Sequence, residues 1–292
     1  MTKVCASGQL PDCTRMWRYL SLDKLIDLLD TGELFFAPLA SFIKSDPYEG
    51  YLPAVAMEAH AGIFGSTIRN FESTLAQLES MSGATQRETS PEGLANLRWK
   101  LNDLKTAPAR FFQAINQSIT INCWHASECE SEAMWRLYGD NGKAVAIETD
   151  FNALKRSMES RQTEHLVHIH PVKYLDFFDA TLKPAHCVVE GHLTPLLKRV
   201  AYKHECEVRA FIGRPLPDVR KGLDMAYWKP SPVRLAVDVT RLVMRVHISP
   251  YTSQPFESSV IRICKLFGLP DGTVEPSKLL RGHEELLKTF NY

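Results

Sequence analysis

SITINCWHASECESEAMWRLYGDNGKAVAIETDF, residues 118–151, is the stretch of the chain that decides the fold. Apolar and polar residues alternate over 119–124, as they do in a half-buried strand, and 144–147 form a short apolar run suited to a central strand. Between them, Ser131 can cap a short helix that ends at Gly139. The stretch therefore predicts a strand, a helical turn rich in aromatic residues, and a second strand.

Upstream of this stretch, the sequence predicts another strand, helix and strand, at 15–20, 21–32 and 33–37. The middle segment has leucine and isoleucine at helical spacing, which indicates an amphipathic helix. Ser21 is placed to cap its start, and Gly32 is placed to take the left-handed conformation at its end.

The loop that follows, 38–50, contains the sequence SDPYEG at its end. Asp46 directly before proline indicates a turn. Two acidic residues and a tyrosine in so short a segment, namely Asp46, Glu49 and Tyr48, suit the rim of a ligand site. A solvated turn accounts for them equally well.

Three parts of the chain differ in character. Residues 1–13 are expected to form a flexible N-terminal arm, and 14–292 a single α+β domain. Within that domain, leucine and isoleucine recur at helical spacing over about 54–116, interrupted at 81–92 by a loop rich in serine, glycine and threonine. This region is predicted to be a helical insertion or lid.

The second half of the chain continues the alternation of helices and strands. Helices are predicted at 152–161, 193–202 and 256–267, and strands at 164–174, 203–212, 233–239 and 242–249. On the strand at 203–212, Glu205, Glu207 and Arg209 share one face. The predicted fold class is therefore α+β, with a mixed or antiparallel central sheet.

Composition narrows the class of protein. The chain has 292 residues, of which 45% are apolar and 23% charged, as in an ordinary globular protein. Basic and acidic residues balance at 34 each, so the broad positive field of a non-specific nucleic-acid binder is absent from the composition. No apolar run has membrane-spanning length and no signal-peptide core follows the N-terminus. We expect a cytoplasmic protein with no membrane partner.

The seven cysteines are odd in number and form no C-x-x-C pair, which favours reduced thiols over a disulfide framework. Cys123 with His125 and Cys129 matches none of the common structural zinc spacings. His168 and His170 share a strand face, but no further ligand completes a set nearby in the sequence. We therefore expect no metal.

The order of these motifs resembles the bacterial family called domain of unknown function 2971. The motifs are W-R-Y, T-G-E-L-F-F, D-P-Y-E, C-W-H, M-W-R-L-Y-G-D, G-K-A-V-A-I-E-T-D and Y-K-H-E-C-E-V-R, and they extend from Trp17 to about Leu280. The family usually has asparagine where this chain has Ser45. The resemblance implies family membership but no activity.

A second resemblance is to the ADP-ribosyltransferase superfold. Those enzymes have an arginine or histidine on the first strand, an aromatic middle motif, and a late strand-borne glutamate, often as Glu-x-Glu. Arg18, the turn with Trp135 and Tyr138, and Glu205-x-Glu207 follow that order. The resemblance implies a split sheet and NAD as co-substrate. It further implies ADP-ribose transfer to a protein or nucleic-acid acceptor, or NAD hydrolysis, in a setting such as bacterial toxin action or phage defence.

The resemblance also implies a role for each residue. Cleavage of the nicotinamide–ribose bond passes through an oxocarbenium-like state that a carboxylate stabilises. Glu207 is the first candidate for this carboxylate and Glu205 the second. Arg18 would hold a phosphate of the dinucleotide. The remaining residues would supply a stacking ring or line the pocket: Trp135 or Tyr138 for stacking, and His125 or Tyr19 for lining.

Three alternatives remain open on the sequence. A metal-dependent nuclease or other hydrolase would use carboxylates with His125 around a divalent ion, namely Asp46, Glu49, Glu205 and Glu207. A non-catalytic domain would sense a nucleotide or a partner protein, with the helical insertion as contact surface. Each polar residue also has a structural explanation, such as an ion pair between Arg18 and a late-strand glutamate.

Overall fold

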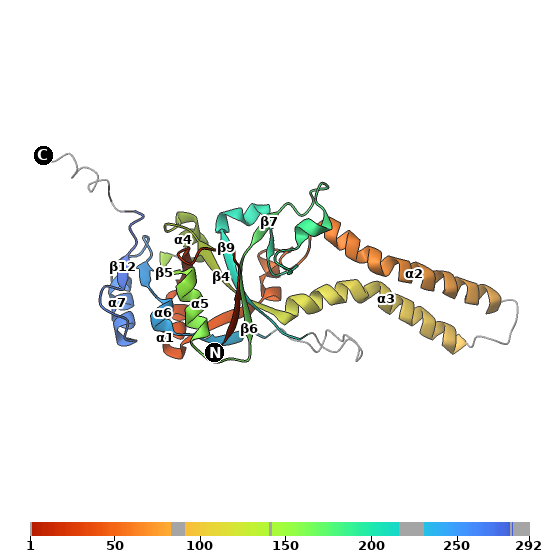
Figure 1. Ribbon diagram of the computed structural model, residues 1–292, viewed down its shortest axis with the longest axis horizontal. Coiled ribbons are helices and arrows are strands. Elements are labelled where there is room, and N and C mark those ends of the chain that lie inside the picture. The colour runs from red at the N-terminus through yellow and green to blue at the C-terminus, as the bar shows by residue number, and fades with distance from the viewer. Residues whose placement is uncertain (1, 83–90, 140–141, 216–230, 281, 283–292) are drawn as a thin grey trace.

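The computed structural model describes residues 2–82, 91–139, 142–215, 231–280 and 282 (Figure 1). It confirms an α+β fold built on one large mixed sheet. Its strands follow the order β1-β6-β9-β4-β2-β5-β11-β12, with β3 pairing both β4 and β10. These strands are β1 Lys3–Ala6, β2 Arg15–Ser21, β3 Glu33–Pro38, β4 Ile119–Ala126, β5 Ala144–Asp150, β6 Leu166–Pro171, β9 Glu207–Gly213, β10 Val233–Ala236, β11 Arg245–Ile248 and β12 Val274–Pro276.

The sheet is mixed because two of its pairs are parallel. β1 pairs in parallel with β6, and β11 with β12, whereas the central strands pair antiparallel. A separate parallel pair consists of β7, Lys173–Leu175, and β8, Leu197–Arg199.

β4 pairs with different strands along its two edges. One edge pairs with β9 from Ile119 to His125. Along the other edge the sheet divides. On the dividing edge, β2 pairs only through Met16 and Trp17, and β3 only through Ala37 and Pro38. β2 and β3 therefore diverge from opposite ends of β4 and leave a fork between them. The split sheet of an ADP-ribosyltransferase stays a prediction.

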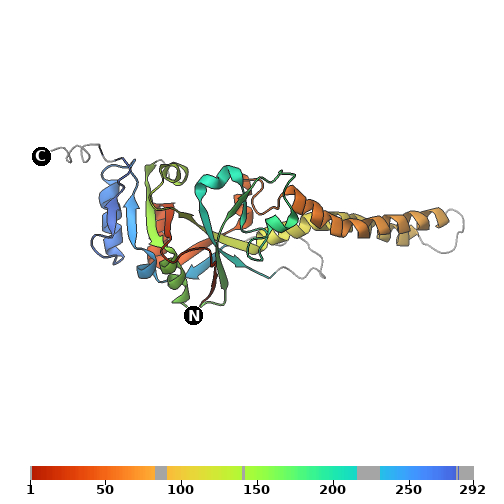
Figure 2. The same ribbon diagram turned by 45° about the horizontal axis from the view of Figure 1, so that its top comes forward.

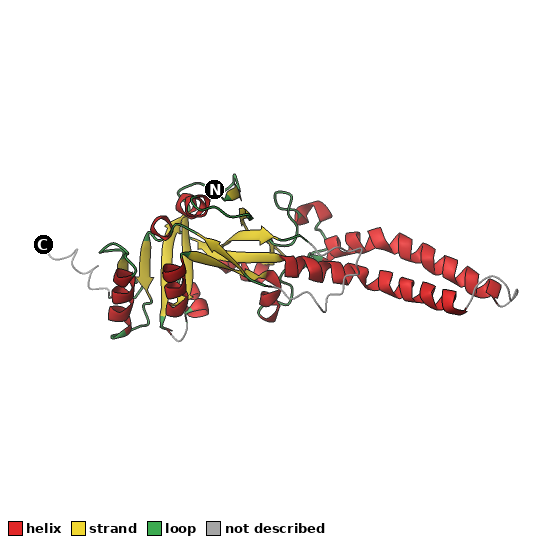
Figure 3. Cartoon of the chain, turned by 90° about the horizontal axis from the view of Figure 1, so that it is seen from below, coloured by secondary structure: helices red, strands yellow, loops and turns green. Residues whose placement is uncertain are grey.

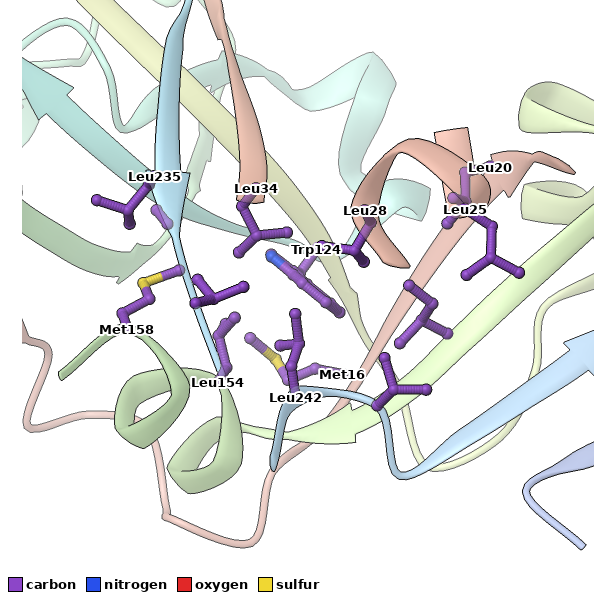
Figure 4. Packing of buried hydrophobic residues seen from close by; sticks show 14 of the residues in the cluster. Met16, Leu20, Leu25, Leu28, Leu34, Trp124, Leu154, Met158, Leu235 and Leu242 are labelled. Carbon is purple, nitrogen blue, oxygen red and sulfur yellow. The ribbon is translucent and has the colours of Figure 1, made fainter. Parts of the chain in front are cut away.

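One face of the sheet carries the main apolar core (Figure 4). Even-numbered residues of β2 and β4, such as Met16 and Trp124, point into it and meet Leu28, Leu154 and Leu242 from the helices. This alternation is what makes a half-buried strand amphipathic. The helices that supply this core are α1 Leu22–Thr31, α5 Phe151–Glu159, α6 Val239–Leu242 and α7 Phe256–Leu266.

Two of these helices have well-defined caps, one at the end of α1 and one at the start of α5. Gly32 ends α1 in the left-handed conformation, with φ of 66°, as predicted. Asp150 caps α5 by accepting a hydrogen bond of 2.7 Å from the Ala153 amide. We expect Asp150→Ala to lower the free energy of unfolding by about 1 kcal/mol. Asp150→Asn keeps an acceptor there, and equal losses in the two variants on urea unfolding would contradict the capping role.

The other face of the sheet is covered in two parts. The short helix α4, Glu132–Tyr138, lies over β2 and β5, where Trp135 packs on Tyr19 and Ala146. The second part covers the far ends of β4 and β9 with the 3₁₀ helix η1, Leu39–Lys44, and the bases of two long helices. Between the two parts lie Cys123 and His125 of β4 and Glu207 and Arg209 of β9.

The two long helices form a hairpin that projects from the body (Figures 1 and 3). α2 is Ala54–Ser82 and α3 is Pro91–Ser118, joined by salt bridges from Glu72 to Lys105 at 2.6 Å and from Glu79 to Arg98 at 2.8 Å. The hairpin and the unit of α7 with β12 lie at opposite ends of the long axis (Figure 2). A function of the hairpin as a lid stays a prediction, and most of the predicted loop 81–92 lies outside the described residues.

Two predictions of local structure are wrong. The N-terminal arm contains β1, which is ordered because its backbone pairs with β6. The predicted helix 193–202 is instead β8 followed by the 3₁₀ helix η4, Val200–Glu205. Leu196 and Leu197 are both buried in the core under the hairpin, so tertiary packing overrides the local helical pattern. The strand after it accordingly begins only at Glu207.

None of the described helices is long and apolar enough to cross a membrane.

Candidate functional site

The polar residues of the second face come from two neighbouring strands. In the antiparallel register of β4 and β9, Cys123 lies opposite Arg209 and His125 opposite Glu207. Partners in a register share a face, and residues two apart on a strand do so as well. The four side chains therefore form a square on one face of the sheet.

Arg209 is the centre of an ion network that we define as Glu49, Lys198, Glu205, Glu207 and Arg209. Its guanidinium is 1% exposed and donates to both oxygens of Glu49, at 2.7 and 3.1 Å, and to both oxygens of Glu207, at 2.7 and 3.1 Å. A further bond of 2.8 Å reaches the Pro195 carbonyl. Glu49 belongs to the D-P-Y-E loop, so the network ties that loop to the central sheet.

Lys198 of β8 completes the network from the other side. Its ammonium donates to Glu205 and, at 3.0 Å, to Glu207. Burial alone raises the pKa of Glu207, but Arg209 and Lys198 outweigh it and hold the pKa at about 2. Glu207 is therefore ionised throughout the neutral range, with each of its oxygens held by a cation.

The D-P-Y-E loop has a second anchor. Arg199 donates a 2.6 Å hydrogen bond to Asp46 and lies over the rings of Tyr48 and Tyr202, at 4.6 and 5.4 Å from their centroids. The Tyr202 hydroxyl in turn donates to the Ser45 carbonyl at 3.1 Å. This bond uses the backbone of residue 45, so it does not depend on whether serine or asparagine stands there.

The carboxylates of the predicted divalent-ion site are all engaged in ion pairs. Asp46, Glu49, Glu205 and Glu207 each pair with a lysine or arginine, so a metal ion among them would have to displace those cations. His125 directs its Nδ1 to the Glu205 carbonyl at 2.6 Å. The described contacts therefore favour an ion network over a metal centre at this place.

The predicted aromatic residues lie next to the network. The ring of Tyr19 is 4.9 Å from that of Trp135 and 6.2 Å from that of His125, in edge-to-face arrangements. Trp135 is only 1% exposed, and its indole NH donates to Glu130 at 3.0 Å. Tyr138 is 46% exposed and is the accessible ring of this group.

The charges of the ion network act on Tyr138. Burial of its hydroxyl raises the pKa of Tyr138, and the charges of Glu205 and Glu207 raise it further against the opposing effect of Lys198. The ring therefore lies within electrostatic reach of both carboxylates. Burial likewise lowers the pKa of His125, which is neutral at neutral pH.

Arg18 takes a different position from the other predicted residues. Strand alternation starts its side chain on the face of Met16 and Leu20, yet its Nη1 donates to the Cys123 carbonyl at 3.4 Å, at the fork where β2 leaves β4. Its guanidinium lies 5.7 Å from the Trp124 ring. Burial lowers the pKa of Arg18, and no carboxylate pairs with it in the part of the chain that the structure describes.

Cys123 connects Arg18 to the carboxylates. Its thiol lies against Glu207, and its pKa is raised well above the ordinary value, first by burial and then by the charge of that glutamate. The thiol is therefore protonated at neutral pH. We define the aromatic–acidic site as the residues on and beside this end of β4, with Arg18 reaching the Cys123 carbonyl from the opposite face of the sheet: Arg18, Tyr19, Cys123, His125, Tyr138, Glu205 and Glu207.

A pocket opens on the same face, beyond Arg209. It has a volume of about 400 Å³ and is lined mainly by aromatic and aliphatic side chains, among them Phe111, Leu193 and Phe211, with His168 and His192 in its wall. His168 lies opposite Phe211 in the register of β6 and β9, with the two rings stacked 4.9 Å apart. Burial, followed by the charges of the neighbouring histidines, lowers the pKa of His168 to about 4.

Sequence reasoning missed two contributors to this face. Lys198 falls in a segment predicted as a helix, where a lysine carries no signal of burial. His192 is far from His168 and His170 in the sequence and reaches them through a tight turn. The dipeptide Glu190-Gly191 is the one local signal of that turn.

A family model described as Protein of unknown function (DUF2971) matches residues 134–210. No curated protein and no solved structure matches the chain. The matched stretch begins inside α4 and ends at Ala210, so it includes Tyr138, Lys198 and both glutamates of the aromatic–acidic site. The match supports the expected resemblance over residues 134–210, whereas the motifs from Trp17 to His125 lie outside it.

Proposed function

We propose that this chain binds NAD and cleaves its nicotinamide–ribose bond, passing ADP-ribose to a protein or nucleic-acid acceptor or to water. One observation carries the proposal. An arginine without a carboxylate partner in the described chain donates to the Cys123 carbonyl, the Cys123 thiol lies against Glu207, and the accessible Tyr138 ring lies within electrostatic reach of Glu205 and Glu207. These are the groups that a dinucleotide with a departing nicotinamide requires.

The contacts assign the two glutamates different roles. Both oxygens of Glu207 are held by Arg209, and one of them also by Lys198. Glu205 is held by Lys198 through Oε2 alone, and its Oε1 has no protein partner in the described chain. Glu205 is therefore the carboxylate that can face positive charge on a ribose, and Glu207 positions Lys198 and Arg209 around it. This reverses the order of preference from the sequence.

The other residues fit parts of the ligand. Arg18 retains donors beyond its single bond to Cys123, and guanidinium donors suit a phosphate. Tyr138 offers a ring for stacking on nicotinamide, whereas the buried Trp135 supports Tyr19. NAD supplies the glycosidic bond that is cleaved, and the protein supplies orientation and charge.

The test is titration of the purified protein with NAD by calorimetry, together with an assay of nicotinamide release. We expect Glu205→Gln to lower the rate of release by about 10²–10³-fold, because a preorganised charge opposite the developing cation is lost. Arg18→Met removes the phosphate donor, and we expect NAD binding to weaken by about 10- to 100-fold.

The matched control is Glu164→Gln, a change of an exposed glutamate on the surface. It should leave both binding and release unchanged. Absence of binding and of release at millimolar NAD in the wild-type protein would refute the proposal. Release that is unaffected by Glu205→Gln would refute the assigned carboxylate.

A further inference from the structure

Three histidines from two segments meet beside the pocket. His168 and His170 come from β6, and His192 from the loop before β8. One ring nitrogen from each lies within 4.8 Å of those of the other two. His192 contacts the ring of His168 edge-to-face at 4.7 Å and that of His170 at 5.5 Å. We call these three residues the histidine cluster.

The turn before His192 fixes its position. Val189 and His192 exchange two backbone hydrogen bonds of 2.8 Å, so Glu190 and Gly191 are the two central residues of a tight hairpin turn. Both have positive φ, 48° and 85°. This pattern is typical of a type I′ turn, in which asparagine and glycine are favoured and glutamate is not.

The unusual glutamate in this turn has two partners. Glu190 Oε1 accepts a hydrogen bond of 2.5 Å from the Ser7 hydroxyl, and Oε2 lies 2.8 Å from His170 Nδ1. A carboxylate at Nδ1 holds the proton on that nitrogen and leaves the Nε2 lone pair free. Both ring nitrogens of His170 are buried and lack a hydrogen bond of regular geometry in the described chain, so Nδ1 has Glu190 as an ion-pair partner and Nε2 has no partner there.

A buried ring nitrogen without a partner is costly. From these observations we propose that His168, His170 and His192 bind one divalent transition-metal ion, with Glu190 as the residue that orients His170. This site is separate from the aromatic–acidic site and goes beyond the proposed function.

The ligand set indicates the kind of metal. Neutral imidazole suits zinc, copper, iron and nickel, whereas magnesium and calcium prefer oxygen ligands. Three protein ligands leave a position open on a tetrahedral ion, as in catalytic rather than structural zinc sites. Because His168 and His192 line the pocket, the open position faces a space of about 400 Å³ with apolar walls. A small, largely apolar molecule with one donor atom for the metal fits such a pocket.

The opposite wall adds one polar group. His60 of α2 lines the pocket and packs against Phe111 in a tilted and Phe112 in an edge-to-face arrangement, with ring centroids 6.2 and 5.3 Å away. Its Nδ1 is buried and has no hydrogen-bond partner in the described chain. It is therefore available to a molecule bound between the hairpin and the metal.

The test is metal binding by the full chain after treatment with a chelator. We expect one equivalent of Zn²⁺ by elemental analysis after dialysis, and with Co²⁺ the visible absorption of a tetrahedral nitrogen-bound ion. Zn²⁺ should also raise the melting temperature, because it binds the folded chain. His192→Ala should abolish all three signals, while His204→Ala, at an exposed histidine outside the cluster, should retain them.

Glu190→Asn separates orientation of the ligand from support of the fold. Asparagine suits the turn, so the metal-free variant should melt no lower than the wild type. We expect its affinity for Zn²⁺ to fall about 10- to 100-fold, as for loss of an orienting partner. Less than one equivalent of Zn²⁺ in the folded wild type, or equal binding by wild type and folded His192→Ala, would overturn the site. Unchanged affinity in Glu190→Asn would overturn the role of Glu190.

Discussion

Arg209→Ala is expected to lower the free energy of unfolding by about 3–5 kcal/mol, because it leaves two buried carboxylates without their shared cation. The side chains of Glu49 and Glu207 are 3% and 5% exposed, so water cannot replace the guanidinium at either of them. The loss also releases the D-P-Y-E loop from β9. Urea unfolding of the variant, followed by circular dichroism, measures the change.

Arg234→Ala is the matched control for this experiment. Arg234 also forms a pair with an acidic residue, Asp27, but both side chains are about 40% exposed and the pair is screened by water. The loss there should be much smaller than at Arg209. Comparable losses in the two variants would mean that burial does not set the strength of the network.

Acid is expected to destabilise the protein through Glu207. Its pKa is about 2 in the folded protein, below the ordinary value of 4.5 that applies to the unfolded chain. The unfolded state therefore takes up the proton first as the pH falls. The stabilisation is complete above about pH 5, is reduced by about 2 kcal/mol at pH 3, and is lost near pH 2.

Glu207→Gln isolates this contribution from those of other groups. The wild type should be more stable than the variant at pH 6, and the difference should shrink by about 2 kcal/mol when unfolding is measured at pH 3. Glu164→Gln, at the surface, should track the wild type at both values. A difference between wild type and Glu207→Gln that stays constant with pH would show that Glu207 is not the titrating group.

The parts of the fold that could be predicted are those whose signal is local. β4, α4 and β5 follow from alternation, a capping serine and an apolar run within 118–151, and α7 forms where a helix is predicted at 256–267. The segment 193–205 could not be predicted in this way. Leu196 and Leu197 are adjacent and both buried, which requires a partner on each side that only the assembled fold supplies.

The candidate sites likewise contain residues that local patterns predict and residues that only the assembled fold brings in. Strand periodicity places Glu207 and Arg209 on one face, and the register of β4 and β9 brings His125 to them. No local pattern reveals that Lys198 pairs with both glutamates, because that contact depends on β8 being a strand. Two of the three histidines were visible as neighbours on β6. The third arrives through a turn whose geometry the sequence marks only by a glycine.

The two salt bridges between the helices of the hairpin are regularly spaced along it. Glu72 and Glu79 are seven residues apart on α2, and their partners Lys105 and Arg98 are seven apart on α3. Seven residues are close to two helical turns, so each such step returns the same sides of the helices to each other. The outer turns stand clear of the sheet (Figure 3). The projection can therefore be shortened by seven residues in each helix, such as 73–79 with 98–104. This removes the pair of Glu79 and Arg98, while Glu72 and Lys105 stay in phase and both sites keep their walls.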